Sequence, residues 1–225
     1  MNVLIACEES QAVCKAFREL GHRAFSCDVQ ECSGGHPEWH CNGDVLAIIN
    51  GNCDFTTMDG KKHTIEGKWD LIIAHPPCTY LSNAGAARLF PHKGELNQER
   101  YEKGLQAKEF FMKMLDADCD HIAVENPIPS RIYGLPKYDQ IIQPYEYGHP
   151  FSKKTCLWLK GLPKLQPTEI IKPEISWVSG GSKRPDGTPR DNKGMKFRDS
   201  KTKSKTFPGI AKAIAEQFSK YIEEN

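Results

Sequence analysis

The chain has 225 residues, of which 39% are hydrophobic and 26% are charged, and its formal net charge is +1. This composition predicts one large α/β domain, excludes a uniformly basic surface for a polyanionic partner, and leaves no apolar run near the ~18 residues that span a membrane. Nine cysteines lack the spacing of a disulfide framework and no signal peptide precedes them, so we expect a reduced, cytoplasmic setting.

The first elements read as a strand, a helix and a second strand. Residues 2–6 are apolar, and residues 11–20 carry apolar side chains at helical spacing up to Gly21. The turn between them contains Ser10, which we expect to cap the helix. The next strand, residues 23–27, leads into Asp28.

Two acidic residues follow predicted strand ends. Asp28 lies about 20 positions after the first turn, where doubly wound folds bind the hydroxyls of a ribose. The turn itself lacks the glycines that let a pyrophosphate approach, so the pattern favours a nucleoside-type cofactor without phosphates. Asp44 follows Gly43 at a possible third strand end. Either acid could instead only cap its turn.

Clustered Cys and His side chains raise the question of zinc. They are Cys27, Cys32, His36, His40 and Cys41. Their spacing matches no standard structural zinc pattern, so we predict an irregular loop and no metal. A weak helix at 46–49 and a polar, turn-rich stretch at 51–68 follow.

The chain is organised around the segment WDLIIAHPPCTYLSNA, residues 69–84. Residues 70–74 predict a buried strand, which Pro76 and Pro77 must end. Cys78 is therefore expected on a rigid turn at the carboxyl end of a parallel strand, where open α/β sheets place their chemistry. The alternative is a small apolar Cys packed under a turn.

A second buried strand that ends in a polar residue and a proline follows the next predicted helix. Residues 99–115 predict a long helix, and residues 121–125 a strand that ends in Glu125, Asn126 and Pro127, with the proline ending the pairing. Consecutive crossover units place parallel strand ends side by side, so Cys78 and Glu125 should face one cleft. Glu125 could alternatively bind only the backbone of the adjacent loop.

The rest of the chain divides by composition. Short strands at 138–143 and 155–159 predict an antiparallel sheet edge, with Lys153 and Lys154 before the second. Residues 182–205 hold nine Lys or Arg against three Asp, which is typical of a phosphate-binding loop or of a solvated loop. Residues 208–222 predict an amphipathic helix. We expect a catalytic domain at 1–163 plus 206–225 and a small basic recognition region at 164–205.

Taken together, Pro76-Pro77-Cys78, Glu125-Asn126-Pro127 and the order of elements resemble the DNA (cytosine-5) methyltransferases over most of the chain. The resemblance implies a Rossmann-like S-adenosylmethionine-dependent methyltransferase fold with a mostly parallel sheet, Cys78 as nucleophile and Glu125 as ring contact. Its small recognition region is similar to that of a compact phage or prophage branch.

The resemblance also distributes binding roles over the chain. It implies cofactor contacts at Ala6, Cys7, Glu8, Ser10, Asp28, Asp44 and Pro76. It implies DNA contacts at Ser82, Asn126, Lys153, Lys154, Lys201, Lys203 and Lys205. We expect a monomer that binds DNA and no membrane. The base that removes the carbon-5 proton stays open between water and His75.

Other functions remain possible at this point. The turn Cys7-Glu8-Glu9-Ser10 replaces the family's glycine-rich one, which favours a catalytically silent nucleic-acid-binding relative. The small recognition region favours a pyrimidine-modifying enzyme that acts on nucleotides. An amino-group methyltransferase would require Asp or Asn before the two prolines, where this chain has His75.

Overall fold

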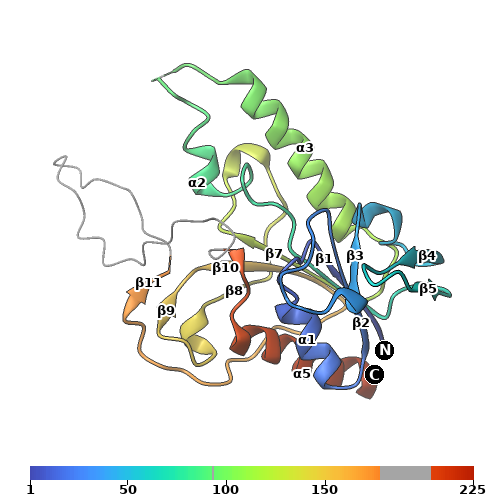
Figure 1. The fold of residues 1–225 in the computed structure, drawn as a ribbon. Helices are drawn as coiled ribbons and strands as arrows, with labels where there is room; N and C mark the ends of the chain where they lie inside the picture. The colour runs from blue at the N-terminus through green and yellow to red at the C-terminus, as the bar shows by residue number, and fades with distance from the viewer. Residues whose placement is uncertain (93, 178–203) are drawn as a thin grey trace.

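Seven strands form the central sheet of the computed structural model, which describes residues 1–92, 94–177 and 204–225 (Figure 1). Their order across the sheet is β3-β2-β1-β6-β7-β10-β8. Their bounds are β1 (Asn2–Ala6), β2 (Arg23–Asp28), β3 (His40–Asn42), β6 (Leu71–Ala74), β7 (Ile122–Pro127), β8 (Gln140–Ile142) and β10 (Thr155–Lys160). This arrangement confirms the predicted Rossmann-like α/β class with a mostly parallel sheet.

One strand of the sheet, β10, runs opposite to the other six. Strands β3, β2, β1, β6 and β7 pair in parallel, whereas β10 pairs antiparallel with both β7 and β8. The parallel strands are buried on both faces, which is why β1 and β6 read as continuous apolar runs. The antiparallel edge predicted from residues 138–159 is confirmed.

Two helices cover one face of the sheet. Helix α1 (Ala12–Glu19) packs beside α5 (Pro208–Glu224), the last element of the chain, and both lie below the sheet in Figure 1. Phe17 from α1 and Phe218 from α5 are fully buried against Val3 and Leu71. The amphipathic pattern of 208–222 is thereby explained, because its apolar stripe faces the sheet.

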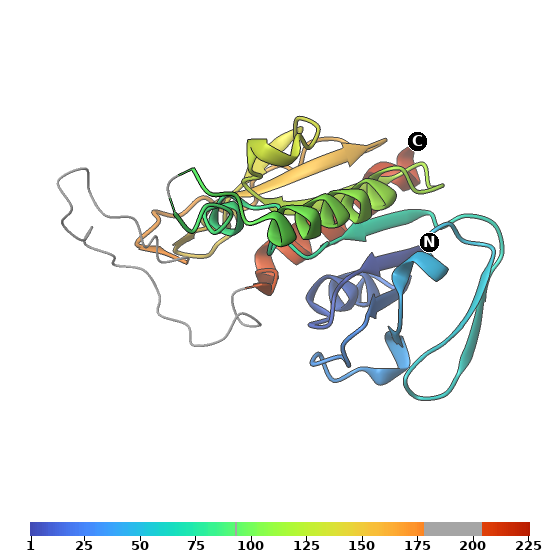
Figure 2. The same cartoon turned by 90° about the horizontal axis from the view of Figure 1, so that it is seen from above.

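The opposite face is covered by α3 (Gln98–Leu115), which runs the length of the sheet in Figure 2. Phe111 and Met114 of α3 are fully buried, and the Phe111 ring meets Trp158 edge to face at 4.9 Å. A hairpin of β4 (Cys53–Thr56) and β5 (Lys62–Ile65) extends this layer, with Phe55 packed on Phe25.

Two sequence predictions differ from the structure. The polar stretch 51–68, predicted as turn-rich, forms the β4–β5 hairpin. Its sequence is typical of a loop because, among its apolar side chains, only Phe55 and Ile65 are buried in the core. The helix expected at 46–49 is a single 3-10 turn, Val45–Ala47. The predicted end of strand pairing at Pro127 is confirmed, because β7 ends at this residue, opposite Thr155 on β10.

Short elements complete the described chain. They are η1 (Pro37–Trp39), α2 (Asn83–Ala86), η3 (Arg131–Tyr133), η4 (Pro144–Glu146), β9 (Phe151–Ser152) and β11 (Ile175–Ser176). Strand β11 pairs in parallel with β9 in a separate two-stranded sheet, which ties part of the predicted recognition region to the segment before β10. Most of the basic run, including Lys201 and Lys203, lies outside the described residues. No helix in the described ranges is long and apolar enough to cross a membrane.

Candidate active site at the carboxyl edge of the sheet

The parallel strands end in register, so the residues at their carboxyl ends lie side by side. Ala6 pairs with Cys27 on one side and with Ala74 on the other, and Ala74 pairs with Val124. The next residues outward along β3, β2, β1, β6 and β7 are Asn42, Asp28, Cys7, His75 and Glu125. Four of these five residue types are acidic or titratable, which concentrates reactive groups at one edge of the sheet.

His75 and Glu125 form the central contact of this row. His75 Nδ1 lies 2.9 Å from Glu125 Oε2, and the two side chains are only 12% and 19% exposed. Burial raises the pKa of Glu125, but the hydrogen bond and charge of His75, with the charge of Lys153, outweigh burial and hold it below its usual value. Glu125 is therefore ionised and oriented by its neighbour.

A small, partly open pocket lies beside this pair. Six of its lining residues are His75, Glu125, Lys153, Thr155, Phe207 and Ile210. Lys153 lies half-buried in the wall, whereas Lys154 is exposed. The two lysines thus differ in position, and the start of α5 adds an apolar wall to the pocket.

Cys78 lies on the loop that follows β6 and Pro77, as the sequence predicts, and is half-buried. Burial raises the pKa of its thiol, and the charge of Glu125 raises it further, while the charge of Lys153 lowers it. The same two side chains thus act electrostatically on Cys78 and on each other. Cys78 rests as a thiol and requires a positive charge or a base to become a thiolate.

The segment after Cys78 is anchored by a residue that the sequence analysis missed. Arg100, in the first turn of α3, donates hydrogen bonds from Nη2 to the carbonyls of Thr79 and Gly85, at 3.2 and 3.0 Å. Its guanidinium also lies 4.9 Å from the centre of the Tyr80 ring. A Cβ on Gly85 would overlap the Thr79 carbonyl, so glycine is required there. A long-range contact of this kind leaves no local sequence signal.

Three other predicted site residues lie close to this loop. Ser82 is buried and caps α2 by accepting a hydrogen bond from Gly85 N at 3.2 Å. Pro76 is also buried. Asn126 is 1% exposed, and its Nδ2 donates to the carbonyl of Pro127 at 2.8 Å. Since side chains alternate along a strand, Asn126 and Glu125 point to opposite faces of β7.

The turn after β1 adopts an unusual backbone for its sequence. Cys7 and Gln11 both have a φ of 58°, a left-handed conformation that glycine adopts without strain. Between them, Glu8 is buried and caps α1, because its Oε1 accepts from Val13 N at 2.7 Å and its Oε2 from Cys14 N at 3.1 Å. The predicted cap was wrong, since Ser10 Oγ accepts only a 3.4 Å bond from Ala12 N.

We expect Glu8→Ala to lower the free energy of unfolding by about 2 kcal/mol, because two buried amides at the helix start lose their acceptor. Urea denaturation followed by circular dichroism measures this change. The matched control is Glu19→Ala, at the exposed end of the same helix. Equal stability of the two variants would show that Glu8 does not cap α1.

Asp28 and Asp44 lie near the same turn. Burial raises the pKa of Cys7 to about 12, and the charges of Asp28 and Asp44 add to this effect. The three side chains therefore lie near one another. Asp28 Oδ1 accepts from Gln30 N at 2.8 Å, and Asp44 Oδ1 accepts from Leu46 N at 3.0 Å. Each carboxylate has a second oxygen to offer a ligand, and Asp44 is exposed.

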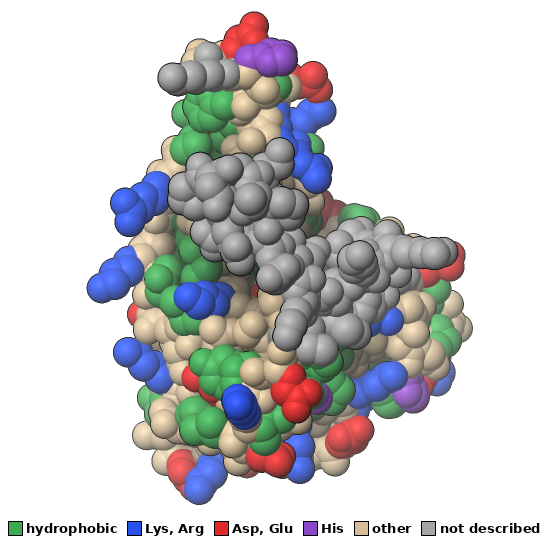
Figure 3. Space-filling model, turned by 90° about the vertical axis from the view of Figure 1, so that its left-hand side faces the viewer, with side chains coloured by type: hydrophobic (Ala, Val, Ile, Leu, Met, Phe, Trp, Pro, Cys, Tyr) green, Lys and Arg blue, Asp and Glu red, His purple; other side chains and the backbone are tan. Residues whose placement is uncertain are grey.

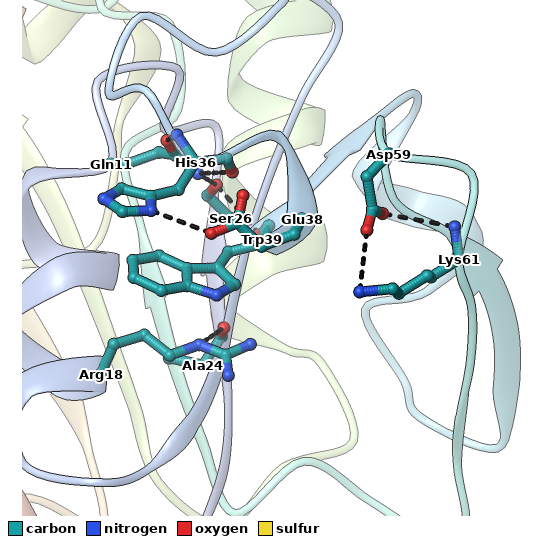
Figure 4. A network of polar contacts seen from close by, with 9 residues as sticks. All are labelled: Gln11, Arg18, Ala24, Ser26, His36, Glu38, Trp39, Asp59 and Lys61. Carbon is teal, nitrogen blue, oxygen red and sulfur yellow. Dashed lines mark hydrogen bonds and ion pairs between the residues drawn. The ribbon is translucent and has the colours of Figure 1, made fainter.

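The clustered His and Cys segment is held by other interactions (Figure 4). The side chain of Gln11 bonds both backbone groups of His36, whose ring stacks on Trp39 at 3.8 Å. The two ring nitrogens of His40 lie 2.8 Å from Ser26 Oγ and 2.9 Å from the Gln30 carbonyl. Within the described ranges, no three His, Cys, Asp or Glu side chains are arranged to hold a metal ion.

Two cysteines of this segment interact with each other. Cys27 and Cys41 are register partners on β2 and β3, and a hydrogen bond from the Cys27 thiol lowers the pKa of Cys41. We therefore expect iodoacetamide at pH 7.5 to alkylate Cys41 before Cys78, whose pKa is raised. Peptide mass spectrometry over time gives the order. Faster labelling of Cys78 would contradict it.

The surface is not uniformly charged. On the face shown in Figure 3, Lys and Arg side chains stand along the left edge, whereas positive and negative side chains mix along the bottom. Lys205, which precedes α5, is exposed. A row of positive side chains thus lies along one edge of this face, although the total charge is near neutral.

Comparisons with known proteins give fold likeness only. No family model matches the chain, and no curated protein matches it. Similar solved structures include the methyltransferase EhMeth of Entamoeba histolytica, at a TM-score of 0.42 and 14% identity over 76% of this chain and 57% of that one. A triple mutant of Spodoptera frugiperda DNMT2 is similar at a TM-score of 0.37 and 15% identity, over 76% of this chain and 54% of that one. The chain spans just over half the length of these structures.

Proposed function

We propose that this chain transfers a methyl group from S-adenosylmethionine to carbon 5 of cytosine in DNA through a covalent adduct of Cys78. The observation that carries the proposal is the convergence of Cys78, Glu125 and Lys153 at the carboxyl edge of the sheet. There the charges of Glu125 and Lys153 both act on the thiol. A soft nucleophile beside a carboxylate and a cation suits addition to an electron-poor ring.

The residues near the first turn fit the cofactor. Asp28 is the last residue of β2, where a carboxylate binds ribose hydroxyls in doubly wound folds, and Asp44 is exposed nearby. Ala6, Cys7, Glu8, Ser10 and Pro76 would complete the contacts. When bound, S-adenosylmethionine supplies an electrophilic methyl group on a sulfonium.

The chain's own residues would make carbon 5 reactive. The Cys78 thiolate adds to carbon 6, and the sulfur–carbon bond forms as the carbon 5–carbon 6 π pair moves to carbon 4 and the carbon 4–nitrogen 3 π pair moves onto nitrogen 3. Glu125 binds the ring at nitrogen 3 and the exocyclic amine, and it stabilises the new electron density there. Lys153 favours the thiolate. After transfer, loss of the carbon-5 proton expels Cys78 as thiolate.

DNA would have to present an extruded base to this pocket, because the reacting carbons lie inside the duplex stack. Ser82, Asn126, Lys153 and Lys154 are proposed to hold the extruded nucleotide, and Lys201, Lys203 and Lys205 the phosphate backbone. In this proposal residues 164–205 form the recognition region on a catalytic domain of 1–163 and 206–225.

The test is transfer of tritium from methyl-labelled S-adenosylmethionine into mixed-sequence duplex DNA, followed by nucleoside analysis. We expect the label in 5-methylcytosine. Label in N4-methylcytosine or N6-methyladenine would show that the chain is an amino-group methyltransferase. Label only in free nucleotides would show that the substrate is a nucleotide and not DNA. A folded protein that incorporates no label and binds no cofactor would be a silent nucleic-acid-binding module.

A further inference from the structure

The cytosine chemistry leaves one proton without a source. When a thiolate adds to carbon 6, nitrogen 3 of the ring gains an electron pair and must take up a proton. Glu125 is the group proposed to contact that nitrogen, yet its pKa is held below the usual carboxyl value. An ionised carboxylate can accept hydrogen bonds but has no proton to give.

His75 is the group next to Glu125 that can hold this proton. Burial opposes a charge on its ring, but the hydrogen bond to Glu125 and the charges of Glu125 and Glu8 outweigh burial and raise its pKa, against a smaller opposing effect of Lys153. Glu8 acts at a distance, since both of its oxygens already accept amide hydrogen bonds from α1. The two opposite shifts favour a proton on His75 over one on Glu125.

The surroundings leave that proton one route. Within the described parts of the chain, Glu125 is the hydrogen-bond partner of the His75 ring, and the buried Nε2 atom has none. The carbonyl of Ala6 fixes the backbone of His75 by accepting from its N at 2.9 Å. The ring is thus positioned with Nδ1 toward Glu125, and the pocket lies beside both side chains.

We propose that His75 is a positioning residue that stores the proton which Glu125 delivers to nitrogen 3 of the cytosine ring. The proton moves from Nδ1 of His75 to the Glu125 carboxyl group, which donates it to nitrogen 3 as the sulfur–carbon bond forms. His75 is then neutral, Glu125 is again a carboxylate, and the proton returns when Cys78 is expelled. This inference rests on the proposed function.

The first test is the pH dependence of tritium release from DNA that carries 5-tritiated cytosine, in single turnover. His75→Asn keeps a neutral donor toward Glu125 but cannot hold the proton. At pH 8 we expect tritium release by His75→Asn to be about 10²-fold slower than by wild type, the effect of losing a general acid. Near pH 5.5 we expect the two rates to agree within about threefold, because the Glu125 carboxyl group then begins to hold a proton without His75. A ratio that is constant with pH would overturn the inference.

The second test does not depend on turnover. In 15N-labelled protein at pH 7.5, we expect both ring nitrogens of His75 to be protonated, and Glu125→Gln to remove this charge. His40 is the internal control, because it is fully buried between neutral groups and burial lowers its pKa. A neutral His75 ring at that pH would overturn the proton store.

The two tests separate failure of the inference from failure of the proposed function. If the wild type releases tritium and His75→Asn has the same pH profile, the inference about His75 is contradicted but the proposed function is not. A wild type that releases no tritium contradicts the cytosine chemistry, and the role of His75 falls with it.

Discussion

Cys78→Ala and Cys78→Ser are expected to lower methyl transfer by about 10⁴-fold or more, because neither side chain can form the covalent adduct through which the reaction is divided into easier steps. The serine variant keeps the approximate size of the side chain, but its hydroxyl is a far weaker acid and nucleophile than a thiol. The fold and the cofactor affinity should change little, since Cys78 is half-buried on a loop.

The measurement pairs label incorporation with adduct trapping on DNA that contains 5-fluorocytosine, where fluorine cannot leave as a proton does. Wild type should give a complex that survives denaturation, and both variants should give none. Cys32→Ser is the matched control, because Cys32 is also half-buried but lies in the segment after β2. Turnover retained in both Cys78 variants would remove the nucleophile from the proposal.

Glu125→Gln is expected to lower the single-turnover rate by about 10²- to 10³-fold, because the amide keeps the shape of the side chain but cannot pass a proton to the ring. DNA affinity should change less than about threefold, since phosphate contacts dominate it. Rapid quench gives the rate, and fluorescence anisotropy gives the affinity. The control is Glu174→Gln, an exposed acid before β11. A rate equal to wild type would exclude Glu125 from the reaction.

The parts of the fold that could be predicted are those whose signal is local. β1 and β6 are short apolar runs ended by a turn or by Pro76, and α3 and α5 show helical periodicity over long segments. Parallel neighbours end at one edge, so the adjacency of β6 and β7 followed from their order in the chain. The roles proposed for Cys78 and Glu125 at that edge remain predictions.

What the sequence did not reveal depends on contacts between distant residues. The β4–β5 hairpin has few apolar residues, so only its packing against Phe25 makes it a structured element. The His75–Glu125 bond joins residues 50 positions apart, and the Arg100 contact to Thr79 joins residues 21 apart. Glu8 was expected at the cofactor, but its capping of α1 was missed because a cap contributed from outside the helix has no fixed spacing.

The cap on α1 has a consequence for which adenosine compounds can enter the proposed cofactor site. The first amides of a helix ordinarily attract phosphate, but here those of Val13 and Cys14 are already bonded to the Glu8 carboxylate. ATP and dinucleotides would therefore meet the carboxylates of Asp28 and Asp44 and no free N–H groups of Val13 and Cys14, which other folds offer to phosphate. A sulfonium cation would meet the same charge favourably, so we expect the proposed site to discriminate between adenosine derivatives by the sign of their charge.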